Sequence, residues 1–141
     1  MSDGGGVITG DGYAVANIDD LGDGPGFRKI RKELGVTAFG VNAIIVPPGL
    51  GSNRHVHDEQ EELYFVHRGR IEIEFTDGTR HELGPGGVAR VDAATVRQYT
   101  ALGDEEAVIV VAGGKDGYVG RDGRLAEGET SRFQGGPPSG A

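Results

Sequence analysis

Hydrophobic positions along this chain fall in short runs that are separated by turns rich in glycine and proline. In the clearest run, Ile71, Ile73 and Phe75 alternate with two glutamates. Because side chains alternate between the two faces of a strand, this pattern predicts a strand with one buried face. Asp77-Gly78 follows, a favoured two-residue hairpin turn. The sequence therefore predicts a hairpin here, with residues 79–83 as its return strand.

Other short apolar runs share these features and indicate further strands. The predicted strands are 13–18, 41–46, 63–66, 88–91, 96–101 and 107–112. Residues 27–34 fit either a helical stripe or an edge strand, and no helix of three turns is expected. About eight short strands indicate an all-β fold, a double-sheet antiparallel barrel of jelly-roll type. The interior of such a barrel is just wide enough for one small ligand.

Composition fits one domain of this kind. The chain has 141 residues, and its 27 glycines suit many tight turns better than a helical bundle. Residues 1–12 and 128–141 are rich in Gly, Ser, Pro and Asp, which predicts flexible segments. Residues 13–127 are expected to form a single barrel between them.

Charge and hydropathy exclude several classes of partner. The formal net charge of −8 argues against nucleic-acid binding, which needs a basic surface. No run approaches the roughly 20 apolar residues of a membrane span, and the N-terminal residues lack the pattern of a signal peptide. The chain has no cysteine, so disulfides and thiolate chemistry are excluded. We expect a cytoplasmic protein that binds a small molecule.

The candidate chemistry lies in a stretch with two histidines one residue apart. On an extended strand, His55 and His57 point to the same face. Glu62 follows five positions later, on the next predicted strand. Two neutral imidazoles and one carboxylate can hold a divalent transition metal from one side.

These residues also match the first motif of the cupin superfamily, which the chain resembles over roughly residues 36–113. That motif reads Gly, five residues, His-x-His, three or four residues, Glu, six residues, Gly. Its positions are filled here by Gly49, His55, His57, Glu62 and Gly69. The resemblance implies the cupin barrel and a metal held by His55, His57 and Glu62.

The second cupin motif is degenerate in this chain. It usually reads Gly, five residues, Pro-x-Gly, two residues, His, three residues, Asn. Aligned on Gly86, its later positions hold Asp92, Ala94, Arg97 and Ala101. The motif's histidine normally supplies a fourth metal ligand. Arg97 cannot replace it, because a guanidinium stays protonated and has no lone pair to offer.

Two interpretations of Arg97 remain open. In the first, His55, His57 and Glu62 bind Fe, Mn, Ni, Co or Zn, and Arg97 holds a carboxylate or enolate substrate beside the metal. In the second, Arg97 takes the metal's place and pairs with Glu62 inside the barrel. The histidines then hydrogen-bond a ligand or water, and the protein is a metal-free, non-catalytic module for small anions.

Two tyrosines are candidates for the same pocket. Tyr64 shares the strand face of Glu62, and Tyr99 that of Arg97. Either phenol can line the pocket as a hydrogen-bond donor or pack the core. Residues 115–127 carry turn signals whose role the sequence does not reveal.

The resemblance and an open coordination sphere together imply an activity. The expected reaction is an oxygen-dependent oxidation, as by a dioxygenase, or an isomerisation of a small acidic molecule. No residue is identified as catalytic. The resemblance also implies a homodimer, because small cupins commonly pair through an added strand or a sheet face.

Overall fold

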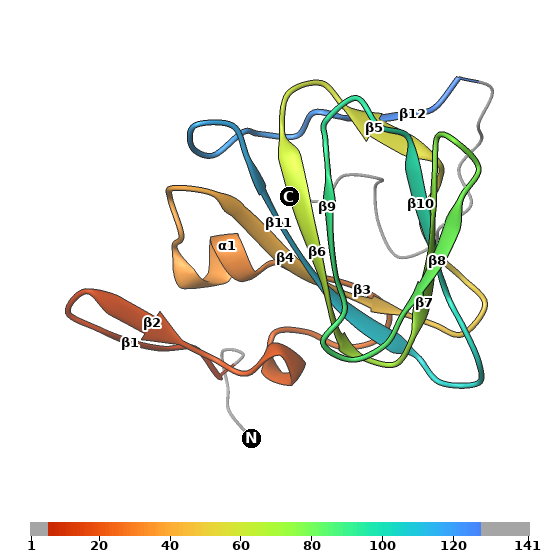
Figure 1. Cartoon of the computed structure of the whole chain (residues 1–141). Coiled ribbons are helices and arrows are strands. Elements are labelled where there is room, and N and C mark those ends of the chain that lie inside the picture. Colours follow the sequence, from red (N-terminus) through yellow and green to blue (C-terminus); the bar gives the residue numbers. More distant parts are fainter. Residues whose placement is uncertain (1–5, 128–141) are drawn as a thin grey trace.

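Two five-stranded antiparallel sheets face each other in the computed structural model, which describes residues 6–127 (Figure 1). The first sheet has the order β12 (Gly123–Leu125), β5 (His55–His57), β10 (Arg97–Ala101), β7 (Ile71–Phe75) and β8 (Arg80–Leu83). The second has the order β3 (Gly26–Arg28), β4 (Gly40–Val46), β11 (Ala107–Gly114), β6 (Glu61–Arg68) and β9 (Val88–Val91). The predicted all-β jelly-roll class is confirmed.

The remaining elements are short and lie near the N-terminus. A hairpin of β1 (Ile8–Gly10) and β2 (Tyr13–Val15) stands apart from the two sheets in Figure 1. It is followed by the 3-10 turn η2 (Ile18–Asp20) and, after β3, by α1 (Ile30–Leu34). The described helices include none long and apolar enough to cross a membrane.

Local structure adds detail to the sequence expectation in two places. The stretch 27–34, which fitted a helix or a strand, contains both, since β3 ends at Arg28 and α1 begins at Ile30. Strand β1 falls within residues 1–12, where a flexible segment was expected; it pairs with β2 through a turn at Gly12, whose φ is 87°. The predicted flexible stretches 1–5 and 128–141 lie outside the described residues.

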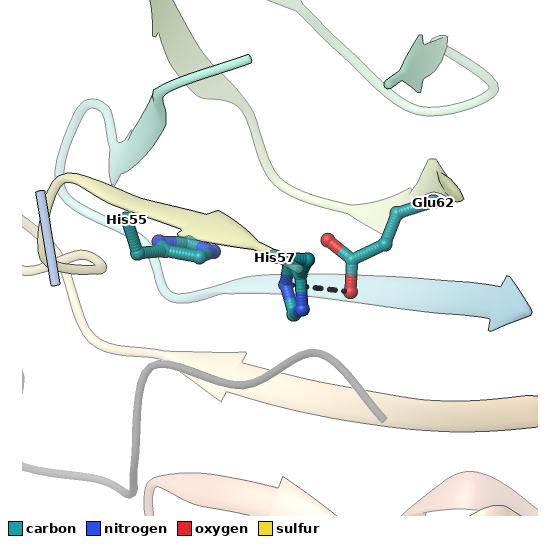
Figure 2. A group of neighbouring side chains, drawn as sticks. All are labelled: His55, His57 and Glu62. Carbon is teal, nitrogen blue, oxygen red and sulfur yellow. Dashed lines mark ion pairs between the residues drawn. The ribbon is translucent and has the colours of Figure 1, made fainter. Parts of the chain in front are cut away.

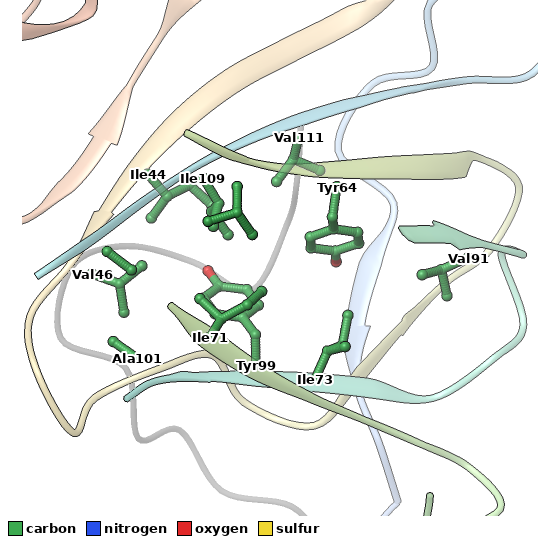
Figure 3. Close-up of a cluster of buried hydrophobic side chains, with 12 residues drawn as sticks. Ile44, Val46, Tyr64, Ile71, Ile73, Val91, Tyr99, Ala101, Ile109 and Val111 are labelled. Atoms are coloured by element: carbon green, nitrogen blue, oxygen red, sulfur yellow. The ribbon is translucent and has the colours of Figure 1, made fainter. Parts of the chain in front are cut away.

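The core fills the space between the sheets (Figure 3). Both sheets contribute apolar side chains on their inner faces, as alternation requires. The buried cluster consists of Ile44, Val46, Tyr64, Val66, Ile71, Ile73, Val91, Tyr99, Ala101, Ala107, Ile109 and Val111. Because Tyr64 and Tyr99 belong to this cluster, polar hydroxyl groups lie among its apolar side chains.

Glycines of the recognised motifs occupy turns that need a left-handed backbone. Gly49 and Gly69 have φ values of 79° and 74°, and Gly86 has 89°. A residue with a side chain is strained in this region, whereas glycine is not. Gly49 therefore opens the segment that leads into β5, and Gly69 makes the turn between β6 and β7.

Candidate metal centre

The three candidate ligands come together from strands of opposite sheets. His55 and His57 lie on β5 in the first sheet, and Glu62 lies on β6 in the second. Figure 2 shows Glu62 directed toward the His57 ring, with His55 beside it on the same strand. All three side chains are buried, with at most 2% of each residue exposed.

Distances between the donor atoms suit a shared ion. One ligand atom from each of the three residues lies within 4.8 Å of the others. His57 Nε2 and Glu62 Oε2 are 3.3 Å apart. Two ligand atoms that are each about 2.0–2.2 Å from one ion have about this separation at tetrahedral or octahedral angles. His57 Nε2 and Glu62 Oε2 form an ion pair when His57 is protonated, and neither atom has a hydrogen bond to any other group.

Each imidazole is held by a contact at its Nδ1 atom. His55 Nδ1 lies 2.8 Å from the carbonyl oxygen of Asn53, which can only accept a hydrogen bond. Nδ1 must therefore donate, and a neutral His55 carries its lone pair on Nε2. His57 Nδ1 lies 2.8 Å from Asp122 Oδ1. Metal-ligating histidines typically have such a partner on the nitrogen that does not bind the metal.

Asp122 is a site residue that the sequence did not reveal. It directly precedes β12, whose pairing with β5 places Gly123 opposite His57. Its position lies 65 residues from His57 in the chain, outside both motifs. The pairing of β12 with β5, together with the backbone N–H groups of residues 58–60, brings the two residues together.

Arg97 lies inside the barrel, with none of its side chain exposed. Its Nη2 atom is 3.2 Å from Glu62 Oε1, and Nη1 donates to the carbonyl oxygens of Ala93 and Thr95. Its Nε atom has no hydrogen-bond partner. Arg97 thus pairs with Glu62 Oε1, as the metal-free interpretation expects, while Glu62 Oε2 faces His57, as the metal-binding interpretation expects.

Tyr64 contacts the same carboxylate, and Tyr99 lies next to Tyr64. The Tyr64 hydroxyl donates to Glu62 Oε1 at 2.8 Å. The rings of Tyr64 and Tyr99 meet edge to face, with centroids 6.1 Å apart. Tyr64 therefore both packs in the core and lines the site.

Burial and neighbouring charges set the protonation of the two histidines differently. Burial is the main cause that lowers the pKa of His55 to about 4. Burial also acts to lower the pKa of His57, but the nearby carboxylates of Glu62 and Asp122 outweigh it and raise that pKa. Without a metal, a protonated His57 can donate to both carboxylates. A metal ion at this position would take the place of the Nε2 proton.

The two carboxylates are held ionised. Burial acts to raise the pKa of Glu62, but His57, Arg97 and Tyr64 together lower it. Hydrogen bonds from Gln60, the Glu59 backbone N–H and His57 outweigh burial and lower the pKa of Asp122. Burial raises the pKa of both Tyr64 and Tyr99, so their hydroxyl groups stay protonated and can donate. The donor set of two imidazoles and one ionised carboxylate fits a divalent transition metal.

A family model described as "Cupin domain" matches residues 43–113, half of the chain. Among curated proteins, none matches this sequence. A solved sugar phosphate isomerase of the cupin superfamily from Silicibacter pomeroyi is 26% identical, with a TM-score of 0.63. A solved structure of DMSP lyases is 27% identical, with a TM-score of 0.56. A cupin protein from Bacteroides fragilis is 23% identical, with a TM-score of 0.62, and shows the shared fold.

Coverage differs among these structures. The match with the isomerase covers 72% of this chain and 64% of the isomerase. The match with the lyase covers 63% of this chain and 44% of the lyase. For the Bacteroides fragilis protein it is 74% of this chain and 86% of the other. This chain thus spans less than two thirds of the isomerase and less than half of the lyase.

Proposed function

Because this chain belongs to the cupin family, we propose that its barrel binds a divalent transition metal through His55, His57 and Glu62 and acts on a small acidic molecule. The observation that carries the proposal is the convergence of two buried imidazoles and one buried carboxylate, with one ligand atom of each residue within 4.8 Å of the others. In neutral His57 with its lone pair on Nε2, this atom and Glu62 Oε2 face each other as two acceptors, which costs free energy unless a cation lies between them. A metal ion satisfies both at their 3.3 Å separation.

The metal would supply Lewis acidity or, if redox-active, oxygen chemistry. Fe, Mn, Ni, Co and Zn all suit two imidazoles and a carboxylate. Of the two reaction classes considered, isomerisation is favoured by the likeness to a sugar phosphate isomerase. A dioxygenase, and hence an oxidoreductase, is the other candidate, because three protein ligands leave coordination positions open.

Chemistry around the ligands supports an acidic substrate. Arg97 is a buried, permanent cation, and its Nε–H has no hydrogen-bond partner. A substrate carboxylate, phosphate or enolate oxygen would be a suitable acceptor for it. Tyr64 and Tyr99 are the phenols that we assign to substrate binding, with Tyr64 also holding Glu62 in place.

Elemental analysis of the purified protein tests the metal site. We expect a near-stoichiometric transition metal in the wild type, and loss of that metal in His55→Ala and Glu62→Ala. His81→Ala is the matched control, because His81 is an exposed histidine on β8 and should leave the metal content unchanged. Metal-free wild-type protein that also fails to bind added Fe(II), Mn(II), Ni(II) or Zn(II) would contradict the proposal.

A second candidate function follows from the Arg97–Glu62 ion pair. In it the barrel is metal-free and holds a small anion against Arg97 without catalysis. Arg97→His separates the two candidates, since the imidazole restores the fourth ligand of the usual cupin motif. Tighter metal binding in this variant supports a site poised for metal, whereas anion binding by wild-type protein with no metal affinity in either form supports the second candidate.

We also propose a homodimer that forms through the outer face of the second sheet. Phe65 on β6 and Val88 on β9 are directly paired, so their side chains share a face. Leu63 lies on that face as well, and all three are exposed. Apolar side chains gathered on one sheet face are typical of a protein interface. Cytoplasmic location stays a prediction from the sequence.

A further inference from the structure

The carboxylate of Asp122 is fully engaged by its surroundings. Its Oδ2 atom accepts the backbone N–H groups of Glu59 at 2.8 Å and Gln60 at 3.1 Å. Its Oδ1 atom accepts Gln60 Nε2 at 2.6 Å and lies 2.8 Å from His57 Nδ1. Asp122 is thereby fixed against the turn between β5 and β6, which joins the histidine strand to the glutamate strand.

The direction of the bond between His57 and Asp122 follows from these contacts. Two backbone N–H groups and one amide N–H can only donate, so the carboxylate acts as an acceptor at both oxygens. His57 Nδ1 must then carry a hydrogen and donate it to Oδ1. Glu62 Oε2 is an acceptor for the other nitrogen, but at 3.3 Å it is farther from Nε2 than Asp122 Oδ1 is from Nδ1 at 2.8 Å. A neutral His57 therefore keeps its hydrogen on Nδ1 and has its lone pair on Nε2, the atom that faces Glu62 Oε2.

We propose that Asp122 is a positioning residue that fixes the tautomer and ring orientation of His57, so that Nε2 is ready to bind the metal. The inference rests on the proposed metal site and adds a residue from outside the region that the family model matches. It also gives β12 a role, because the pairing of Gly123 with His57 carries Asp122 to the site. Strand β12 thus completes a centre whose ligands all come from earlier strands.

Asp122→Asn tests the assignment with little change in size. Its amide oxygen can still accept the backbone N–H groups of Glu59 and Gln60. Its NH₂ group then takes the place of Oδ1, where it faces His57 Nδ1 and loses the hydrogen bond from Gln60 Nε2. An NH₂ group donates and cannot accept, so it favours the tautomer with the hydrogen on Nε2. Asp58→Asn is the matched control: Asp58 pairs with Arg124 of β12 at 2.6 Å, and this change also removes one carboxylate near that strand.

The decisive readout is the ring tautomer in metal-free protein, measured by ¹⁵N NMR of the histidines. The sample is held well above the ordinary histidine pKa of about 6.5, until the His57 signal shows a neutral ring. We expect the hydrogen on Nδ1 of His57 in the wild type and in Asp58→Asn, and its transfer to Nε2 in Asp122→Asn. A wild-type His57 with its hydrogen on Nε2 overturns the proposal, and this result needs no variant to fold.

Metal titration against a competing chelator gives a second, separate readout. Loss of a partner that orients a metal ligand typically costs about 10–100-fold in metal affinity. We expect a loss of about this size in Asp122→Asn, and less than about twofold in Asp58→Asn. Equal affinity of wild type and Asp122→Asn overturns the positioning role. If no form binds metal, the proposed function fails, whereas the tautomer measurement still decides whether Asp122 controls His57.

Discussion

His55 shows how burial, as the largest of several effects, sets the chemistry of a single residue. Its ring is almost fully buried, its Nδ1 donates to a carbonyl, and its pKa falls to about 4. A histidine that stays neutral at physiological pH is ready to bind metal without first losing a proton. The same burial lowers the free energy of unfolding at low pH, because His55 takes up a proton in the unfolded chain but stays neutral in the folded chain.

The sign of this effect gives a testable pH dependence. Below the ordinary histidine pKa the unfolded state binds the extra proton, so stability falls as pH falls. Between about pH 6.5 and about pH 5, we expect His55 to reduce the free energy of unfolding by about 1.5 kcal/mol. His57 does not add to this slope: its raised folded pKa gives stability that is fully present below about 6.5 and lost at higher pH.

Urea unfolding of metal-free protein at several pH values checks this prediction. His55→Gln removes the titrating ring and should flatten the slope in this window. The carboxylates of Glu62 and Asp122 have lowered pKa values, so their contributions are lost only at more acidic pH. A slope that is the same in wild type and His55→Gln would contradict the assignment to His55.

Tyr64 tests how strongly the site depends on its hydroxyl contact with Glu62. Tyr64→Phe keeps the ring in the core but removes the donor to Glu62 Oε1. A hydrogen bond to a charged group is worth about 1.5–3 kcal/mol, so we expect a loss of that size in the free energy of unfolding. Tyr99→Phe is the control, since Tyr99 packs in the same cluster without this bond to Glu62. Equal losses in both variants would show that the contact with Glu62 adds nothing.

At the scale of elements, the segment before β5 must lie very close to β10. Ser52 donates its backbone N–H to the Tyr99 carbonyl at 2.9 Å, and Gly51 forms a bridge with Thr100. A Cβ atom on Gly51 would collide with the Tyr99 carbonyl oxygen and with the backbone of Thr100. Glycine at this position therefore lets β5 and its histidines approach the strand that carries Arg97.

Gly51→Ala should consequently be far more damaging than Gly49→Ala. Gly49 has a positive φ with open space around it, so alanine costs only backbone strain of about 1–3 kcal/mol. The Cβ atom of Gly51→Ala would instead collide with backbone atoms of Tyr99 and Thr100. We therefore expect a larger loss of stability together with weaker metal binding. Thermal unfolding and chelator competition on both variants measure this. A Gly51→Ala variant as stable as Gly49→Ala would show that the strands can separate without cost.

For the whole molecule, the outer face of the second sheet exposes Leu63, Phe65 and Val88 beside the Arg90–Glu61 ion pair. Val88 is 58% exposed, and Phe65 lies directly opposite it on the neighbouring strand. The hairpin of β1 and β2 exposes Ile8, Tyr13 and Val15 in addition. Water contact with this much apolar surface is unfavourable, which supports the proposed dimer.

Val88→Lys tests the dimer by placing a charge on that face. Light scattering after size exclusion measures the mass in solution. We expect twice the 14.7 kDa of one chain for the wild type and the mass of one chain for the variant. His81→Lys, on an exposed strand of the other sheet, should remain a dimer. A wild type that elutes as a monomer at all concentrations would contradict the proposal.

The sequence by itself determined the fold class and the candidate ligands, because both depend on local spacing. Alternation in the 71–75 run marked a half-buried strand, and the one-residue spacing of His55 and His57 placed two imidazoles on one face. Gly69 was identified as a position of the cupin motif, and its left-handed backbone explains why glycine is favoured there.

Only the tertiary structure decided how Arg97 and Asp122 relate to those ligands. Arg97 could have displaced a metal or stood beside it; the distances show it bound to one oxygen of Glu62 while the other faces His57. Asp122 carried no local signal, because its role depends on the pairing of β12 with a strand 65 residues earlier. Such contacts arise from the closing of the sheets, and no periodicity along the chain encodes them.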